Sequence, residues 1–474
     1  MIRLTWNELY KIFHKKLLYI ILIIAIGFSI LACIGDKLLT NNSYDLDLTI
    51  NNTMITNYEN AGDVTSPEYI SLKSVNKMIE IKKEKNIKKE SPEEYYIDNV
   101  VETNYSNYFS ATKSADILPE NVELLKTTYE DSLKFLDSFD WKQLIKDEMN
   151  KIDTEEYSCS VEDQSKCDAI KKEEKKVLEY RLNNNIPYSY NDASSELVNY
   201  IEIYKEYLDV KDLDEKRLEY ENKLNKRNVE EMYYKTKYLM DNRLLTNDYS
   251  LNNTGEDLAY RFGTPSGLLI IVLLALSASC IAEEFNKGTI KQLLVKPFSR
   301  TKIVLSKMFA VLITTIIMLF VLNISLVIIN GLFNNDLKTV LGRIVIYDFN
   351  VNKCIEMSYI KYSLISFVYM LPQIILLSMF VFTMSVLSTN TAFALGMGFG
   401  AYVSETIFPL FLERFKFISY VPTLNYNLTT YMFGHINNYE GLTLSKAILV
   451  DSVSFVVLLV LIIFIFNKKD IKNQ

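Results

Sequence analysis

The 474-residue sequence is poor in histidine and lacks the glycine-rich loop by which many proteins bind ATP. Its only histidines are His14 and His435, and neither accompanies the adjacent carboxylates Glu283 and Glu284 as a metalloprotease site would require. No G-x-x-x-x-G-K-[ST] sequence is present, so we expect no ATP to be bound in that manner. The glycine-rich run at 396–400 follows no strand pattern and is not a nucleotide loop. We therefore expect this chain to bind no metal and no cofactor.

The sequence also lacks a basic soluble face. Residues 36–263 contain 47 acidic and 31 basic residues, a net charge of −16, whereas the remainder contains 11 and 20, a net charge of +9. The acidic character therefore belongs to one inserted domain, and the apolar remainder is basic. This distribution argues against nucleic acid as a partner.

Cysteine is scarce, with five residues in the chain. Cys33 and Cys280 lie in apolar runs and are interpreted as small core residues, while Cys354 stands alone in a polar connector. Cys159 and Cys167 are close together in a polar segment with no histidine nearby. They form a local disulfide if that segment is extracellular, or they are two unpaired thiols; the spacing leaves both alternatives open.

Residues 1–16 have the pattern of a short amphipathic helix. Thr5 and Glu8 fit a T-x-x-E capping box at its start. Trp6, Leu9 and Phe13 share one face, which suits the surface of a membrane. The net positive charge of the segment favours the cytoplasmic side.

Residues 17–34 are uncharged and apolar, and the run is about long enough to cross a bilayer. Two alternatives are a cleaved signal peptide and lipidation at Cys33, which follows a loose lipoprotein-like box. The amphipathic start and the later apolar segments favour a retained first transmembrane helix.

Residues 36–263 predict a soluble, mainly helical domain. Val122, Leu125, Tyr129 and Leu133 recur at helical spacing, and a second long helical pattern runs from 194 to 245. No heptad repeat persists long enough to indicate a coiled coil.

Residues 264–466 predict five further transmembrane helices. The apolar runs are 263–282, 308–329, 362–387, 391–407 and 447–466. Pro372 predicts a kink in the third of these, Pro409 predicts a helix end just after Glu405, and Asp451 is expected at the membrane interface. The fold class is an all-α polytopic membrane protein with six transmembrane helices and a mainly helical extracellular domain.

The distribution of basic residues predicts the orientation. With the N-terminus inside, residues 1–16, 283–307, 388–390 and the tail 467–474 are cytoplasmic and hold 13 of the 20 bases outside the acidic domain, but only 4 of the 11 acids. This asymmetry follows the positive-inside rule. We expect a multi-pass protein of the cell membrane with both termini cytoplasmic and residues 36–263 outside. His14 and His435 then lie on opposite faces.

The basic loop 283–307 has the pattern of a turn, a short helix and a new helix. Gly288 and Thr289 suit the turn, Pro297 ends the short helix, and Ser299 can cap the next one. Leu293 and Leu294 contribute an apolar face to the short helix, which could dock in a groove of a partner. The alternative is an ordinary basic loop.

This loop resembles the loop between the second and third spans of ABC-2-type transporter permeases. The residues that carry the resemblance are Glu283, Glu284, Gly288, Thr289, Leu293, Leu294, Pro297, Ser299, Arg300 and Lys307. The six-span layout, the amphipathic start and the large insertion after the first span are also similar to that family. The resemblance covers the membrane part and leaves the acidic domain unmatched.

The resemblance implies that the short helix is a coupling helix on a separate ATP-binding subunit, which would hold ATP and Mg²⁺. It further implies a second permease chain, identical or different, and a translocation path between the two. The substrate would be amphipathic or hydrophobic, such as an antimicrobial peptide, a drug or a lipid-like molecule. This chain would then be a transport subunit and not itself an enzyme.

Two features of the fifth apolar run are further candidates. Glu405 is an acid within a membrane segment, for which we favour a structural or water-facing role. Gly396 and Gly400 form G-x-x-x-G, which indicates close helix packing, at a dimer contact in one interpretation. The alternative function for the whole chain is a membrane-anchored sensing or immunity module whose acidic domain binds cationic peptides.

Overall fold

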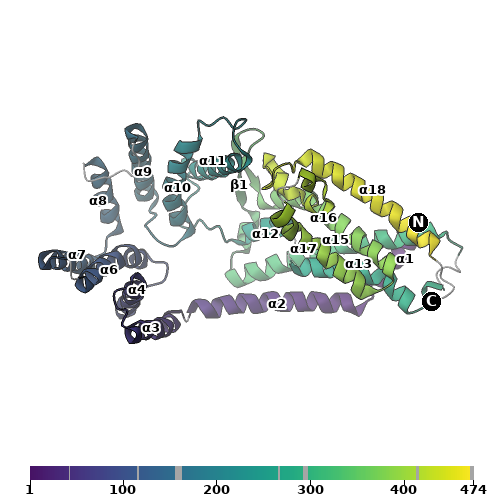
Figure 1. Ribbon diagram of the computed structural model, residues 1–474, viewed down its shortest axis with the longest axis horizontal. Coiled ribbons are helices and arrows are strands. Elements are labelled where there is room, and N and C mark those ends of the chain that lie inside the picture. Colours follow the sequence, from purple (N-terminus) through teal and green to yellow (C-terminus); the bar gives the residue numbers. More distant parts are fainter. Residues whose placement is uncertain are drawn as a thin grey trace. The chain divides into compact units, whose positions relative to one another are not determined.

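The computed structural model describes residues 1–41, 43–114, 117–154, 163–264, 267–291, 297–412 and 416–469. They divide into two compact units: unit 1 comprises 1–34 and 252–474, and unit 2 comprises 35–251. Both consist mainly of helices (Figure 1). The boundary near residue 251 falls twelve residues before the predicted one at 263, because helix α12 (Thr254–Gly263) packs against α15 and α16 of unit 1.

Unit 1 is a helical bundle in which α13, α15 and α16 supply most of the buried core. Its remaining helices are α1, α12, α17 and α18, together with the first part of α2. The bounds are α1 Ile2–Phe13, α2 Lys16–Asn41, α13 Gly267–Asn286, α15 Arg300–Asn334, α16 Tyr359–Ser388, α17 Thr391–Leu412 and α18 Leu444–Lys468. The predicted apolar runs fall within these helices, except that the run 263–282 begins four residues before α13.

Within the described residues, α15, α16 and α18 are long and apolar enough to cross a membrane. Figure 1 shows these three helices side by side. The 35 residues of α15 extend about 52 Å at 1.5 Å per residue, well beyond a hydrocarbon core of about 30 Å. The helix is therefore longer than a perpendicular crossing of that layer requires.

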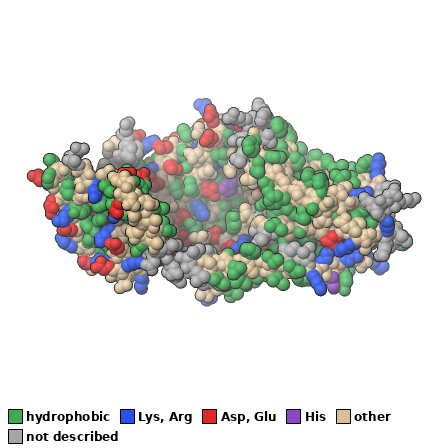
Figure 2. Space-filling view, turned by 60° about the horizontal axis from the view of Figure 1, so that its bottom comes forward, with side chains coloured by type: hydrophobic (Ala, Val, Ile, Leu, Met, Phe, Trp, Pro, Cys, Tyr) green, Lys and Arg blue, Asp and Glu red, His purple; other side chains and the backbone are tan. Residues whose placement is uncertain are grey.

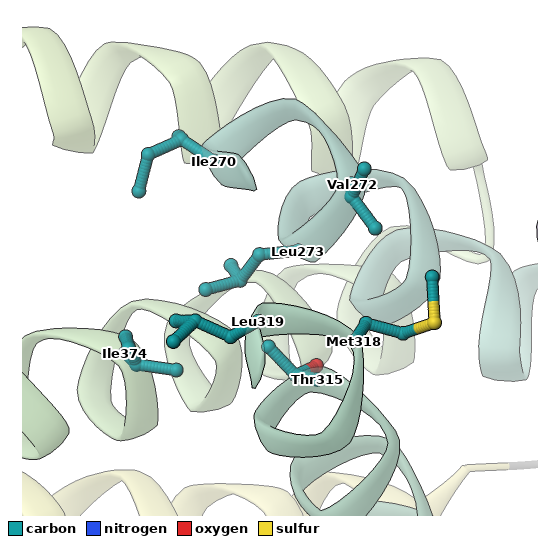
Figure 3. Close-up of a pocket in the computed structure, with 7 residues that line it drawn as sticks. All are labelled: Ile270, Val272, Leu273, Thr315, Met318, Leu319 and Ile374. Atoms are coloured by element: carbon teal, nitrogen blue, oxygen red, sulfur yellow. The ribbon is translucent and has the colours of Figure 1, made fainter. Parts of the chain in front are cut away.

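The bundle core contains one small cavity of about 10 Å³ between α13, α15 and α16. Among the side chains drawn around it in Figure 3, only Thr315 carries oxygen. Its hydroxyl is buried and has no hydrogen-bond partner among the described residues. A buried water needs two to four polar partners, so this cavity is not a built water site.

The predicted capping box at the start of α1 is wrong. The helix begins at Ile2 with Met1 as its N-cap, so Thr5 and Glu8 lie inside it. The Thr5 hydroxyl donates to the Met1 carbonyl at 3.3 Å, and the Glu8 carboxylate accepts from lysine side chains instead of the backbone. An ammonium partner offers a carboxylate a stronger bond than a neutral amide does.

The opposite end of the bundle contains a feature that the sequence analysis missed. Strands β1 (Arg343–Asp348) and β2 (Lys353–Ser358) form an antiparallel hairpin, so the unit is not entirely α-helical. Short helical turns η2 (Leu337–Leu341), η3 (Lys416–Tyr420), η4 (Pro422–Leu424) and η5 (Leu428–Gly434) complete this end. The signal for the hairpin in the sequence was the β-branched run at 344–346, which precedes an asparagine-rich turn.

Unit 2 is entirely helical in its described part. Its helices are α3 Ser43–Ala61, α4 Pro67–Glu84, α5 Pro92–Tyr96, the π-helical turn η1 Ile97–Val101, α6 Glu102–Lys113, α7 Pro119–Asp137, α8 Trp141–Asp153, α9 Gln164–Asn184, α10 Asp192–Val210 and α11 Tyr220–Asp241. The single long pattern predicted from 194 to 245 is two helices, because a charged segment at 211–219 interrupts it. Cys167 is buried in α9 and disulfide-bonded, whereas Cys159 lies outside the described residues.

The two units differ in the side chains they expose. In Figure 2, hydrophobic side chains cover much of the visible surface of the unit 1 helices, and charged side chains gather over unit 2. Large apolar residues are exposed along α15 and α18, among them Ile317, Val321, Val456 and Val460. Such surfaces suit lipid around unit 1 and water around unit 2.

Candidate functional site: the Lys307 junction

A buried lysine joins three helices at one end of the bundle. Lys307, in the second turn of α15, is 1% exposed. Its ammonium donates to Glu8 Oε2 on α1 at 2.6 Å and to Glu284 Oε1 on α13 at 2.6 Å. This arrangement ties the N-terminal helix to both ends of the basic loop.

Helical periodicity brings these three charges together. Glu8 and Ile12 are one turn apart on the buried face of α1. Glu284 likewise lies one turn after the buried Cys280 on α13. On α15, Lys307 follows the buried pair Ile303 and Val304 at the matching spacing. When the apolar neighbours are buried in the bundle, the three charged side chains therefore come to lie next to one another.

Three further charges surround this pair of bonds. Lys11 donates to Glu8 at 2.8 Å and lies 3.9 Å from Glu284, and Lys15 donates to Glu283 at 3.0 Å. We call Glu8, Lys11, Lys15, Glu283, Glu284 and Lys307 the Lys307 junction. Its buried members Lys307 and Glu8 are paired with each other, which is the condition under which buried charges are tolerated, and the exposed Lys287 also lies 3.4 Å from Glu283.

The electrostatics of the junction favour the ionised form of Glu8. Burial alone would raise the pKa of the Glu8 carboxyl, but Lys307 and Lys11 outweigh burial and hold the pKa below its ordinary value. Glu284 Oε2 is buried and accepts no hydrogen bond from any described residue. The junction thus retains one unused acceptor.

The ends of other helices meet at the same end of the bundle. Arg300 Nη1 donates to the carbonyls of Asn467 and Lys469 at the end of α18, each at 3.1 Å. The ammonium of Lys469 in turn donates to Val386 O and Leu387 O at the end of α16. Four segments that the sequence assigned to one membrane face are therefore neighbours in space.

The structure describes only part of the predicted coupling loop. Gly288 adopts φ +69° in a turn, and the Thr289 hydroxyl donates to Glu284 O at 3.4 Å. Ser299 caps α15 as predicted, accepting from the Lys302 amide, and Pro297 precedes it. Leu293 and Leu294, the predicted docking face, lie outside the described residues.

The predicted glycine pair on α17 does not pack within this chain. A Cβ added at Gly396 or Gly400 would meet no described atom within 4 Å. The close helix contact is at Gly398 instead, where a Cβ would lie 2.4 Å from Val381 Cγ2 and 2.8 Å from Leu274 Cδ2. Gly396 and Gly400 lie on an open face of the helix.

The acids in the predicted membrane segments differ in their surroundings. Glu405 Oε2 accepts from Gln373 Nε2 of α16 at 2.7 Å, and α17 continues through Pro409 to Leu412. The predicted helix end at Pro409 is wrong, since a proline in the last turn deprives only the Glu405 carbonyl of a partner. Asp451 is only 6% exposed, and both its oxygens lack a partner among the described residues, so it is buried within unit 1.

Glu284 and Lys307 were predicted as parts of the loop without being paired, and Glu8 was not predicted as their partner. The available signal was the helical spacing of Glu8 and Ile12, which places the acid one turn before an apolar residue. Within the described ranges, no group of three His, Cys, Asp or Glu side chains is placed to hold a metal ion.

The chain has two similarities to known proteins, and the family match falls on unit 1. Residues 246–472 match the family described as "Protein of unknown function (DUF2705)". A Bacillus subtilis (strain 168) protein described as "Uncharacterized protein YhcI" is 26% identical over 240 residues, which are 48% of this chain and 75% of the relative. The family match includes Glu283, Glu284 and Lys307 but neither α1 nor most of unit 2.

Proposed function

We propose that this chain is the permease subunit of an ATP-driven exporter of the ABC-2 type. The observation that carries the proposal is the Lys307 junction, which links the start of the basic loop, its end and the N-terminal helix. ATP hydrolysis takes place on a separate subunit that docks on this loop.

The Lys307 junction suits a mechanical connection between the docking loop and the helical bundle. Glu284 and Lys307 close the loop at its base with a 2.6 Å bond, so a displacement of the loop moves α13 and α15 together. Removing one partner from a buried ion pair costs about 3–5 kcal/mol, so the junction resists separation. Glu8 extends the same connection to α1.

The proposed topology has six transmembrane helices. Three are α15, α16 and α18, and the others are α2, α13 and α17. The neighbouring positions of α1, Arg300, Lys469 and the end of α16 support a common cytoplasmic face. Unit 2 then lies outside the cell membrane.

The substrate class follows from the apolar character of the bundle. An amphipathic or hydrophobic molecule, such as an antimicrobial peptide, a drug or a lipid-like compound, matches a path between apolar helices. A second permease chain, identical or different, faces this one, and the open side of Gly396 and Gly400 suits such a contact.

The docking step is tested by purifying the tagged full-length protein from its native membranes in mild detergent. We expect a protein with a phosphate-binding loop to co-purify, identified by mass spectrometry, together with Mg²⁺-dependent ATPase activity. Leu293→Asp and Leu294→Asp should each remove that activity. Leu341→Asp is the matched control, because Leu341 is 78% exposed at the opposite end of the bundle.

The control variant should retain the ATPase. Retention of the co-purified ATPase in both loop variants would contradict docking at this loop. Loss of the ATPase in all three variants would contradict it as well, because the effect would not be specific to the loop.

A further inference from the structure

Unit 2 contains a cavity of about 310 Å³ lined by residues of α5, η1, α8, α9 and α10. Cavities that hold small ligands begin at about this size. Apolar side chains including Leu144, Leu197 and Ile201 form part of the wall, together with Tyr95 and Tyr188. The lining is thus an apolar surface with a few polar groups, as ligand sites commonly have.

A stack of aromatic rings is built into one wall. The ring of Tyr95 lies parallel to that of Tyr188, with centroids 5.5 Å apart and an interplanar angle of 11°. The guanidinium of Arg181 lies 4.1 Å from the Tyr188 centroid. Tyr188 is thus held between a cation and the Tyr95 ring.

Arg181 fixes this wall and offers little to a ligand. It is 1% exposed, and its two terminal nitrogens donate to Pro187 O and to Ser194 Oγ and O, at 2.9–3.2 Å. Its Nε is buried and has no partner among the described residues. A ligand that reached Nε would meet a single donor on a side chain whose terminal nitrogens are already hydrogen-bonded.

Two carboxylates besides the rim pair line the cavity, Glu174 and Glu148, and Glu148 is the one that contacts the aromatic stack. The Glu148 carboxylate accepts from the Tyr188 hydroxyl at 2.8 Å and forms no ion pair with any lysine or arginine in the described part of the chain. Burial raises the pKa of Glu148, against the lowering effects of Tyr188 and Arg181. At the rim, Glu202 and Lys205 are 2.7 Å apart and neutralise each other.

We propose that this cavity binds an organic cation, an ammonium or guanidinium group on a hydrocarbon body, such as a basic side chain of a peptide. The cationic head pairs with Glu148, and the body lies against Tyr95 and the apolar wall. Aromatic faces and a carboxylate are the groups that recognise such cations. The excess of acids in residues 36–263, 47 against 31 bases, raises the local concentration of cations.

This proposal rests on unit 2 alone and holds whether or not the chain is a transporter. The test uses the full-length protein in nanodiscs, titrated by calorimetry with phenethylamine, with the uncharged 2-phenylethanol and with the anionic phenylacetate. We expect phenethylamine to bind at least tenfold more tightly than either analogue. Equal binding of the alcohol, or tighter binding of phenylacetate, would overturn a cation site.

Two pairs of variants locate the site. Glu148→Gln should weaken phenethylamine binding at least tenfold, whereas Asp147→Asn, an exposed neighbour on α8, should leave it unchanged. Tyr95→Phe should retain binding and Tyr95→Leu should lose it, because only phenylalanine keeps the aromatic face. Equal affinities within either pair would overturn the assignment. If Glu148→Gln fails to fold, the tyrosine pair alone tests the proposed site.

Discussion

The ammonium of Lys307 lies 2.6 Å from Glu284 Oε1, although a basic loop separates the two residues in the sequence. The same ammonium lies 2.6 Å from Glu8 Oε2, so one side chain joins three helices. The bonds are buried, and their strength therefore depends little on ionic strength. The predictions below begin with this junction.

Replacing Lys307 by methionine should strongly destabilise unit 1. The change leaves Glu8 and Glu284 buried without their shared ammonium, which should cost about 3–5 kcal/mol. Thermal unfolding in detergent measures the loss. Lys302→Met is the matched control, because Lys302 is exposed one turn earlier on α15 and should have little effect.

The triple change Glu8→Gln, Glu284→Gln and Lys307→Met removes all three charges together. It should recover much of the stability lost in Lys307→Met, since no unpaired charge remains buried. Equal stability of Lys307→Met and Lys302→Met would contradict the junction as described.

Acid should release α1 from the bundle. The pKa of Glu8 is lowered, because Lys307 and Lys11 outweigh burial, so Glu8 stabilises docking above its ordinary pKa and loses this effect as the pH falls through the lowered value. Trp6, which is 71% exposed, reports on α1 by fluorescence in a Trp141→Phe background. The transition should lie at a lower pH than the titration of an ordinary glutamate.

A Glu8→Gln variant supplies the comparison for this titration. It should lack the acid transition of Trp6, because the amide does not titrate. Persistence of the same transition in Glu8→Gln would assign it to another carboxyl group.

Two neighbouring glycines of α17 should respond oppositely to alanine. Gly398→Ala forces a Cβ against Val381 and Leu274, and overpacking of this kind costs about 1–3 kcal/mol. Gly396→Ala meets open space and should not lower the unfolding temperature. Unfolding scans of the two variants measure this contrast, and equal destabilisation would contradict it.

A larger residue at Gly396 tests the proposed second chain. Gly396→Ile should leave the single chain folded but reduce chemical cross-linking between permease chains in native membranes. Unchanged cross-linking would place the contact between chains elsewhere.

Removing the Thr315 hydroxyl should be harmless or stabilising. The hydroxyl is buried without a partner beside the 10 Å³ cavity, and an unsatisfied buried hydroxyl costs about 1–3 kcal/mol (Figure 3). Thr315→Val should therefore keep or raise the unfolding temperature. Its neighbour Thr314 donates to Ala310 O at 2.8 Å, so Thr314→Val should be the less stable of the two.

Binding of phenethylamine in unit 2 should weaken in acid. Burial raises the pKa of Glu148, so its negative charge is lost at a higher pH than that of an ordinary glutamate. Affinity should fall as the pH drops through this raised pKa, while the amine stays protonated. A pH series of calorimetric titrations measures the midpoint, and a pH-independent affinity would contradict a role for Glu148.

The location of the helices could be predicted from the sequence because the signal is local. Most of each apolar run lies in one helix, and the acidic insertion is helical, since run length and periodicity depend only on nearby residues. The hairpin at 343–358 and the break between α10 and α11 were missed. Short β-branched runs fit either a strand or a helix, and a charged segment within a helical pattern does not by itself show that the helix is interrupted.

The sequence by itself therefore determined the helical class, the positions of the apolar helices and the residue types of the basic loop. Only the tertiary structure decided which charges meet. Glu8 has the spacing of a cap, yet it bonds to Lys307 nearly three hundred residues away, and Tyr95 stacks on a tyrosine more than ninety residues further along the chain. Pairings of this kind depend on how buried faces pack together, and a local pattern carries no information about the face it will meet.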